Sequence, residues 1–93
     1  MQNRTVKINA WNCPAPLSLT ATDNYSLIVS FNDGVTVEFD FKPYFQYKVF
    51  EKLKNKELFK KAILDRWAVI WNDDLDIAIE AVYEKGKLID NDN

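Results

Sequence analysis

The chain has 93 residues, a net charge of −2 and 47% hydrophobic residues, among them six Phe, four Tyr and three Trp. This length leaves room for a single domain over 1–93, and the aromatic content excludes a disordered chain. The absence of histidine and the single cysteine exclude an internal disulfide and a zinc site with nitrogen and sulfur ligands. Without a signal-peptide segment or an apolar run near the ~20 residues of a membrane span, the sequence predicts a cytoplasmic protein.

The first part of the chain predicts strands around one irregular segment. Apolar and polar residues alternate over 4–10, which is typical of a half-buried strand. Residues 11–23 include two prolines and predict an irregular insertion with a short extended piece in its second half. Residues 25–31 and 35–41 alternate more regularly, and Asn32-Asp33-Gly34 lies between them. Because Asp and Gly tolerate positive φ, this pattern predicts a tight β-hairpin.

The middle of the chain changes its hydrophobic period. Pro43 suits the first turn of a helix, and the apolar residues that follow predict a helix of about three turns over 43–54. Residues 61–64 and 67–71 then predict two strands joined by a tight turn at Asp65-Arg66. The density of apolar residues on both faces of this second hairpin predicts that it is central or covered.

A second helix is predicted near the C-terminus. Asp76 is a suitable N-cap for a helix over 77–84, Gly86 would end that helix, and the polar residues 90–93 predict a frayed tail. The element order is therefore strand, strand, strand, helix, strand, strand, helix. It predicts an α+β fold in which two helices pack on an antiparallel sheet of about five strands.

An ordered set of short segments between residues 25 and 84 resembles the small bacterial family named domain of unknown function 2442. The segments are Tyr25-x-Leu27-x-Val29-x-Phe31-Asn32-Asp33-Gly34 with Phe39-Asp40, Val49-Phe50-x-x-Leu53-x-x-x-x-Leu58-Phe59, Val69-x-Trp71-x-x-x-x-Asp76-Ile77, and Val82-Tyr83.

This resemblance implies a compact α+β domain without an established enzymatic activity. Members are often encoded beside small toxin-like proteins, which implies an antitoxin-like or partner-binding role. The chain departs from the family pattern in the longer segment 11–23 and in the short Asp65-Arg66 turn, which lacks the usual glycine. We also expect no helix-turn-helix domain within a chain of this length.

Two stretches of opposite charge lie next to each other. Residues 42–66 hold eight Lys or Arg and three acids, a net charge of +5, and residues 67–93 hold seven acids and two lysines, a net charge of −5. The basic stretch fits either a nucleic-acid contact surface or a solvated helix face, and the sequence pI near 5.0 favours the solvated face. The opposite signs also suit association with a second copy of the chain.

The candidate site residues are partner-binding ones. Without histidine, a nucleophile elbow or a phosphate loop, the sequence predicts no enzyme and no cofactor. Asp73, Asp74 and Asp76 are better explained by a turn and an N-cap than by a metal site. Since Trp dominates interface hot spots, Trp11 and Trp67 are predicted on a partner surface, whereas Trp71 is predicted in the core. The basic candidates are Lys48, Lys52 and Lys56.

The sequence thus predicts a non-catalytic protein-binding module. Its predicted partner is a small toxin-like protein or a second copy of the chain, in line with the family resemblance. The alternative is a nucleic-acid-binding regulator that uses the basic face of residues 42–61.

Overall fold

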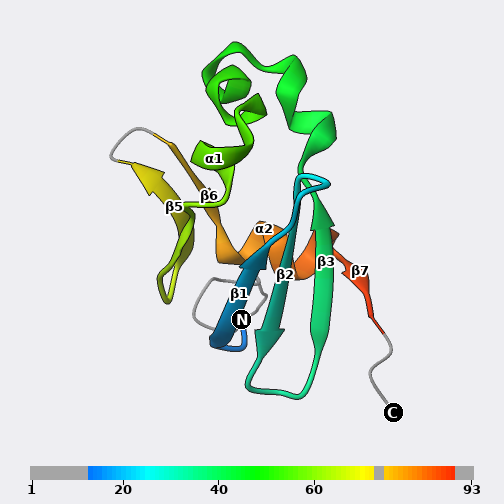
Figure 1. Cartoon of the computed structure of the whole chain (residues 1–93). Helices are drawn as coiled ribbons and strands as arrows, with labels where there is room; N and C mark the ends of the chain where they lie inside the picture. Colours follow the sequence, from blue (N-terminus) through cyan, green and yellow to red (C-terminus); the bar gives the residue numbers. More distant parts are fainter. Residues whose placement is uncertain (1–12, 73–74, 90–93) are drawn as a thin grey trace, which may run out of the picture.

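The computed structural model describes residues 13–72 and 75–89, which form two antiparallel sheets (Figure 1). The α+β class is therefore confirmed. The single sheet of about five strands is wrong, because the helical segment after the first hairpin leads the chain away from it and the returning strands pair only with one another. One sheet has the order β1-β2-β3-β7, with β1 (Pro16–Ala21), β2 (Ser26–Phe31), β3 (Thr36–Asp40) and β7 (Lys87–Leu88). The other has the order β4-β5-β6, with β4 (Ile63–Leu64), β5 (Ala68–Asn72) and β6 (Leu75–Ala78).

The predicted hairpin between β2 and β3 is confirmed. Leu27 lies opposite Phe39 and Val29 opposite Val37, and all four side chains are buried. Gly34 in the turn has φ +89°, the left-handed conformation that glycine adopts without a steric penalty. The turn is thus set by backbone conformation, and the register of the hairpin follows from the alternating pattern.

A side-chain hydrogen bond ties the turn of this hairpin to the C-terminal helix. The Tyr83 hydroxyl donates to Asp33 Oδ2 at 2.7 Å, and the Val35 N–H donates to Asp33 Oδ1 at 2.9 Å. These two donors stabilise the ionised carboxylate and hold the pKa of Asp33 below its usual value.

The short extended piece predicted within the irregular insertion over 11–23 is the strand β1, which is longer than predicted and covers Pro16–Ala21. Pro16 is the first residue of this strand, where its missing N–H does little harm to the ladder, and a β-bulge follows between Pro16 and Ser18. After the bulge the strand pairs regularly with β2, with Leu19 opposite Val29. The predicted strand over 4–10 and the predicted tail over 90–93 lie outside the described residues.

The predicted three-turn helix over 43–54 is instead two 3₁₀ helices, η2 (Lys42–Gln46) and η3 (Lys48–Lys54), separated by Tyr47 with extended backbone at φ −92° and ψ 129°. The sequence of this segment also has a hydrophobic period that favours the 3₁₀ helix over the α-helix. Aromatic or aliphatic residues recur every third position, which matches the three residues per turn of a 3₁₀ helix. These residues are Phe41, Tyr44, Tyr47, Phe50 and Leu53. A short helix, α1 (Lys56–Phe59), follows.

The two strands predicted around the tight Asp65-Arg66 turn are confirmed as β4 and β5. The C-terminal helix begins later in the chain than predicted. The helix α2 (Ile79–Lys85) follows directly on β6, so Asp76 is an exposed strand residue and the N-cap position belongs to Ala78. The prediction of Asp76 as a cap is wrong because Ile77 pairs with Val69 and keeps the chain extended. Gly86 ends the helix as predicted, and β7 follows at once.

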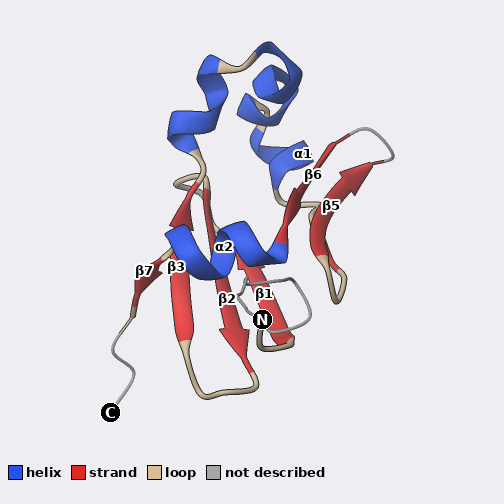
Figure 2. Ribbon diagram, turned by 180° about the vertical axis from the view of Figure 1, so that it is seen from behind, coloured by secondary structure: helices blue, strands red, loops and turns tan. Residues whose placement is uncertain are grey.

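The helix α2 lies across one face of the four-stranded sheet (Figure 2). Its Ile79 and Val82 side chains are buried, and they belong to the same core cluster as the inward residues of both sheets. Because β6 leads into α2 and α2 leads into β7, this helix connects the two sheets through the backbone. Within the described ranges, no helix is long and apolar enough to cross a membrane.

The two glycines are required for different reasons, and substitutions distinguish them. A Cβ at Gly86 would lie 2.6 Å from the Val82 carbonyl oxygen and 2.8 Å from Val37 Cβ, whereas a Cβ at Gly34 would meet open space. We expect Gly86→Ala to lower the free energy of unfolding by about 1–3 kcal/mol through overpacking. We expect Gly34→Ala to cost about 1–2 kcal/mol through its positive φ, and Gly34→Asn to cost less because Asn tolerates that conformation.

Urea unfolding followed by tryptophan fluorescence measures all three variants. A Gly86→Ala protein as stable as the wild type would contradict the close approach of α2 to β3.

Candidate functional site

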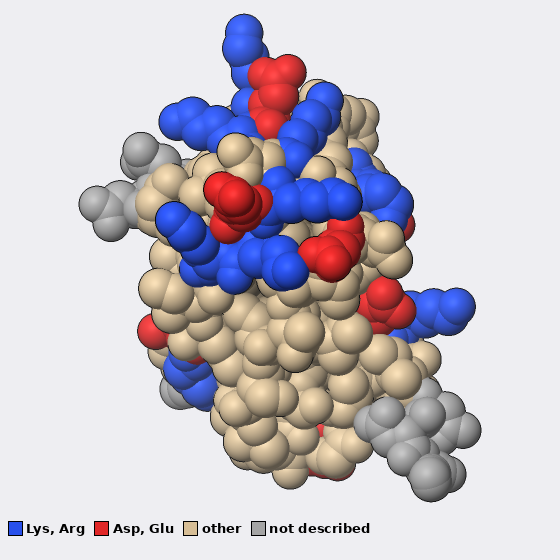
Figure 3. All heavy atoms as spheres, viewed as in Figure 1, with Lys and Arg blue, Asp and Glu red and all other residues tan. Residues whose placement is uncertain are grey.

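Lysine side chains gather over the helical end of the molecule. Figure 3 shows Lys and Arg side chains crowded over the upper part of this face, with a few acids among them, while the part below carries few charges. We call this area the lysine-rich surface, and it comes from η3, α1 and the turn that follows them. Its basic residues are Lys48, Lys52, Lys54, Lys56, Lys60 and Lys61.

Two of these lysines are engaged within the protein. Lys60 Nζ lies 2.8 Å from Asp23 Oδ1 in an exposed ion pair, and Lys56 Nζ lies 5.9 Å from the centre of the Tyr25 ring. The side-chain ammonium groups of the four others, Lys48, Lys52, Lys54 and Lys61, make no hydrogen bond or ion pair with the described part of the chain. Their ammonium groups are therefore the positive charge available to a partner.

Exposed apolar side chains lie among these free lysines. Tyr47 is 52% exposed and Val49 is 55% exposed, and Lys48 stands between them in the chain. Val49 is one of the apolar residues behind the predicted helix over 43–54, but it faces solvent because the 3₁₀ geometry turns Phe50 and Leu53 inward instead. Aromatic residues contribute much of the affinity at protein interfaces, and the rim around such residues is polar and accessible to solvent.

The turn between β1 and β2 holds the helices η3 and α1, which carry the lysine-rich surface, in place. Tyr25 has φ +63°, a conformation that costs a non-glycine residue about 1–3 kcal/mol. Its ring packs edge-on against Phe45 at 5.1 Å and against Phe59 at 5.4 Å, and its hydroxyl donates to the Lys54 carbonyl oxygen. These contacts offset the strain and fix the position of η3 and α1 relative to the first sheet.

The start of α1 has its own local cap. The Asn55 side chain accepts hydrogen bonds from the N–H groups of Glu57 at 2.9 Å and Leu58 at 3.2 Å. Asn is a favoured N-cap residue because it satisfies the first free amides of a helix. The cap determines where η3 ends and α1 begins, and with that the direction in which Lys56 and Lys60 leave the backbone.

Trp67, predicted as a partner-binding residue, lies apart from the lysine-rich surface. It is 49% exposed in the turn between β4 and β5, at the end of the second sheet away from η3 (Figure 1). The Arg66 guanidinium lies 4.1 Å from the centre of its ring, and Arg66 Nη2 donates to the Cys13 carbonyl oxygen at 2.8 Å. The structure therefore places Lys48 and Lys52 on η3 and Lys56 on the adjoining α1, and Trp67 on a separate turn. Trp11 lies outside the described residues.

Two side chains with reactive or polar groups belong to the core. Trp71 is 7% exposed, as predicted, and its Nε1 donates to the Phe59 carbonyl oxygen at 2.8 Å. Cys13 is also buried, and burial raises the pKa of its thiol. A raised pKa keeps the thiol protonated at neutral pH, where it is a poor nucleophile.

Comparison with known proteins matches the chain to one protein family. Residues 16–87, well over half of the chain, match the model of a family described as "Protein of unknown function (DUF2442)". The matched range begins at β1 and ends in β7, so it includes every element that builds the lysine-rich surface. No curated protein and no solved structure matches the chain.

The ion pair between Lys60 and Asp23 predicts that the pKa of Asp23 depends on the Lys60 side chain. The hydrogen bond from Lys60 holds the pKa of Asp23 below its usual value of 3.8. We expect Lys60→Met to raise the pKa of Asp23 toward that value, and Lys52→Met to leave it unchanged. The stabilisation from the pair is present above the usual carboxyl pKa and is lost as pH falls through the lowered one.

Carbon-detected NMR titration of the Asp23 side chain in the three proteins gives these pKa values. An Asp23 pKa that is the same with and without Lys60 would show that the pair does not form in solution.

Proposed function

This chain belongs to the DUF2442 family, whose function is unknown, and we propose that it is a non-catalytic protein-binding module that engages an acidic partner through the lysine-rich surface. The observation that carries the proposal is the combination of free Lys48 and Lys52 ammonium groups with the exposed Tyr47 ring. Charge complementarity would speed the encounter, and burial of the ring would supply affinity.

The proposed partner is a small toxin-like protein with an acidic contact surface. The support is the resemblance to a bacterial family whose members are often encoded beside such proteins, and on the same ground we place the chain in the bacterial cytoplasm. A second copy of the chain is the other acidic candidate, since residues 67–93 carry a net charge of −5. Light scattering of the purified chain separates self-association from binding to another protein.

Nucleic-acid binding is the alternative function for the same surface. Free lysines could contact phosphates, and Tyr47 could stack on an unpaired base. Against it stand the net charge of −2 for the chain and the acids Glu51 and Glu57 within the lysine-rich segment. A protein partner fits this mixed charge better.

Matched charge reversals test the proposal by affinity capture from native-host lysate, quantified by mass spectrometry. Lys52→Glu changes the lysine-rich surface, Tyr47→Ser removes its exposed ring, and the control Lys85→Glu makes the same charge change at the end of α2. We expect a specific acidic protein to be captured by the wild type and the control at similar levels, and its recovery to fall about tenfold or more with either surface variant. Recovery that is equal for all four proteins would refute the proposal.

Fluorescence anisotropy with labelled DNA and RNA of about 20 nucleotides, at low and high salt, tests the alternative. We expect little binding at low salt. Tight binding that weakens steeply with salt and disappears in Lys52→Glu would favour the nucleic-acid function instead.

A further inference from the structure

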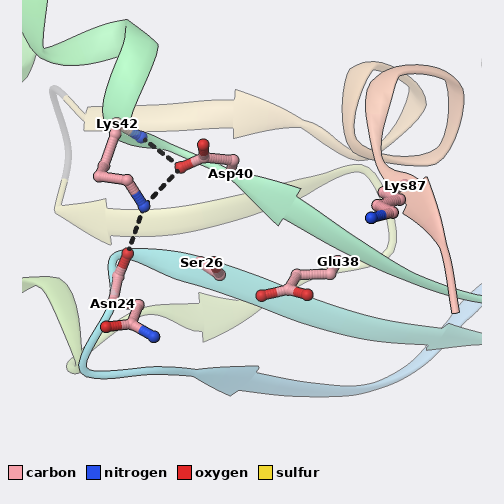
Figure 4. A pocket seen from close by; sticks show the side chains of 6 residues that line it. All are labelled: Asn24, Ser26, Glu38, Asp40, Lys42 and Lys87. Atoms are coloured by element: carbon pink, nitrogen blue, oxygen red, sulfur yellow. Dashed lines mark hydrogen bonds and ion pairs between the residues drawn. The ribbon is translucent and has the colours of Figure 1, made fainter.

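A pocket of about 270 Å³ lies on the face of the four-stranded sheet that points away from α2. Its floor is formed by the outward residues Ser26, Glu38 and Asp40, which alternate with the buried residues of β2 and β3. The turn before β2, the start of η2 and the strand β7 supply the walls (Figure 4). The wall residues are Asn24, Lys42 and Lys87.

One end of the pocket is closed by groups that satisfy each other. Lys42 Nζ lies 3.1 Å from Asp40 Oδ1 and donates to the Asn24 carbonyl oxygen at 3.0 Å. The Lys42 N–H also donates to Asp40 Oδ1 at 3.0 Å. This end is therefore a neutral, structural wall, and Figure 4 shows its dashed interactions on the side away from Lys87.

The remaining polar groups of the pocket have no partners. Ser26 is 4% exposed, and its hydroxyl, which makes no hydrogen bond to any described residue, keeps contact with solvent. The half-buried Glu38 carboxylate has no ion pair or hydrogen bond within 13–72 and 75–89, and neither has the Lys87 ammonium. The half-buried Glu38 carboxylate and the exposed Lys87 ammonium are therefore free to contact a ligand in the pocket, and the Ser26 hydroxyl can add a hydrogen bond as donor or acceptor.

The positions of the two free charges limit the ligand. Glu38 on β3 lies directly opposite Lys87 on β7, and side chains opposite each other on antiparallel strands are about 4.5–5.5 Å apart at Cβ. In Figure 4 the Glu38 carboxylate extends toward the Asn24 end of the pocket rather than toward Lys87. A negative and a positive group are thus presented side by side to the same cavity without neutralising each other.

We propose that this pocket binds a small zwitterion of the α-amino acid class. Its ammonium group donates to the Glu38 carboxylate and the Ser26 hydroxyl, and its carboxylate accepts from the Lys87 ammonium. The size of the pocket agrees, because sites for drug-sized molecules measure about 300–1,000 Å³ and this one is smaller. The proposed ligand contacts come from β2, β3 and β7, so they are independent of the lysine-rich surface on η3 and α1.

The test is a ¹H–¹⁵N NMR titration of the full chain with each of the twenty standard L-amino acids up to ~10 mM, followed by analogues of the best binder that lack one charge. We expect at least one amino acid to give saturable shifts at the backbone amides of Ser26, Glu38 and Lys87. The analogue without the ammonium and the analogue without the carboxylate should each bind at least about tenfold more weakly. A titration in which no amino acid gives saturable shifts at these amides overturns the proposal.

Variants assign the two charges. Glu38→Gln and Lys87→Met should each weaken binding at least about tenfold, whereas Glu84→Gln and Lys85→Met, which make the same changes on α2, should bind as the wild type does. The ¹H–¹⁵N spectrum of each free variant verifies its fold. Undiminished affinity in Glu38→Gln or Lys87→Met overturns the assignment. A lower melting temperature in both, with no amino acid bound by the wild type, identifies Glu38 and Lys87 as an ion pair of the sheet.

Discussion

The packing of aromatic rings around Phe41 is the interaction on which the two-sheet arrangement depends. Phe41 is fully buried, and its ring centre lies 5.1–6.3 Å from those of six other aromatic residues, a range in which ring pairs attract one another. The residue follows directly on β3, at the point where the chain leaves the first sheet. Among its neighbours, Phe50 belongs to η3, Phe59 to α1 and Trp71 to β5. The ring cluster therefore joins sheets that share no strand pairing within the described residues.

The same cluster explains how the lysine-rich surface is presented. Tyr44 stacks on Phe41 at 5.2 Å and Phe50 meets it edge-on at 5.1 Å, so these two rings of the 3₁₀ helices point toward the core. Tyr47, Lys48 and Val49, which lie between Tyr44 and Phe50, are exposed to solvent. The charge and the exposed apolar area of the surface thus result from the helix type that the aromatic packing imposes.

The sequence predicts those features that nearby residues determine by themselves. The features that it does not predict depend on contacts between residues far apart in the chain. The Asp33-Gly34 turn and the alternation around it carry their own signal, and so does the burial of Trp71. The sequence pattern predicts an α-helix for the 3₁₀ segment because its apolar residues fit a period of 3.6 as well as a period of three. Asp76 looked like a cap, but pairing of β6 with β5 overrides that preference. The pocket could not be predicted, because it needs the two-residue strand β7 to bring Lys87 beside Glu38.

Hydrogen exchange of a Phe41→Leu variant, followed amide by amide, tests the role of the ring cluster most directly. Replacement of the ring should lower the free energy of unfolding by about 1–3 kcal/mol. The account predicts that protection falls most in η2, η3 and α1, which depend on Phe41 for their attachment, and least in the hairpin of β2 and β3, which has its own ladder. Protection that falls equally in the hairpin and in the helical segment, or that does not fall at all, would contradict it.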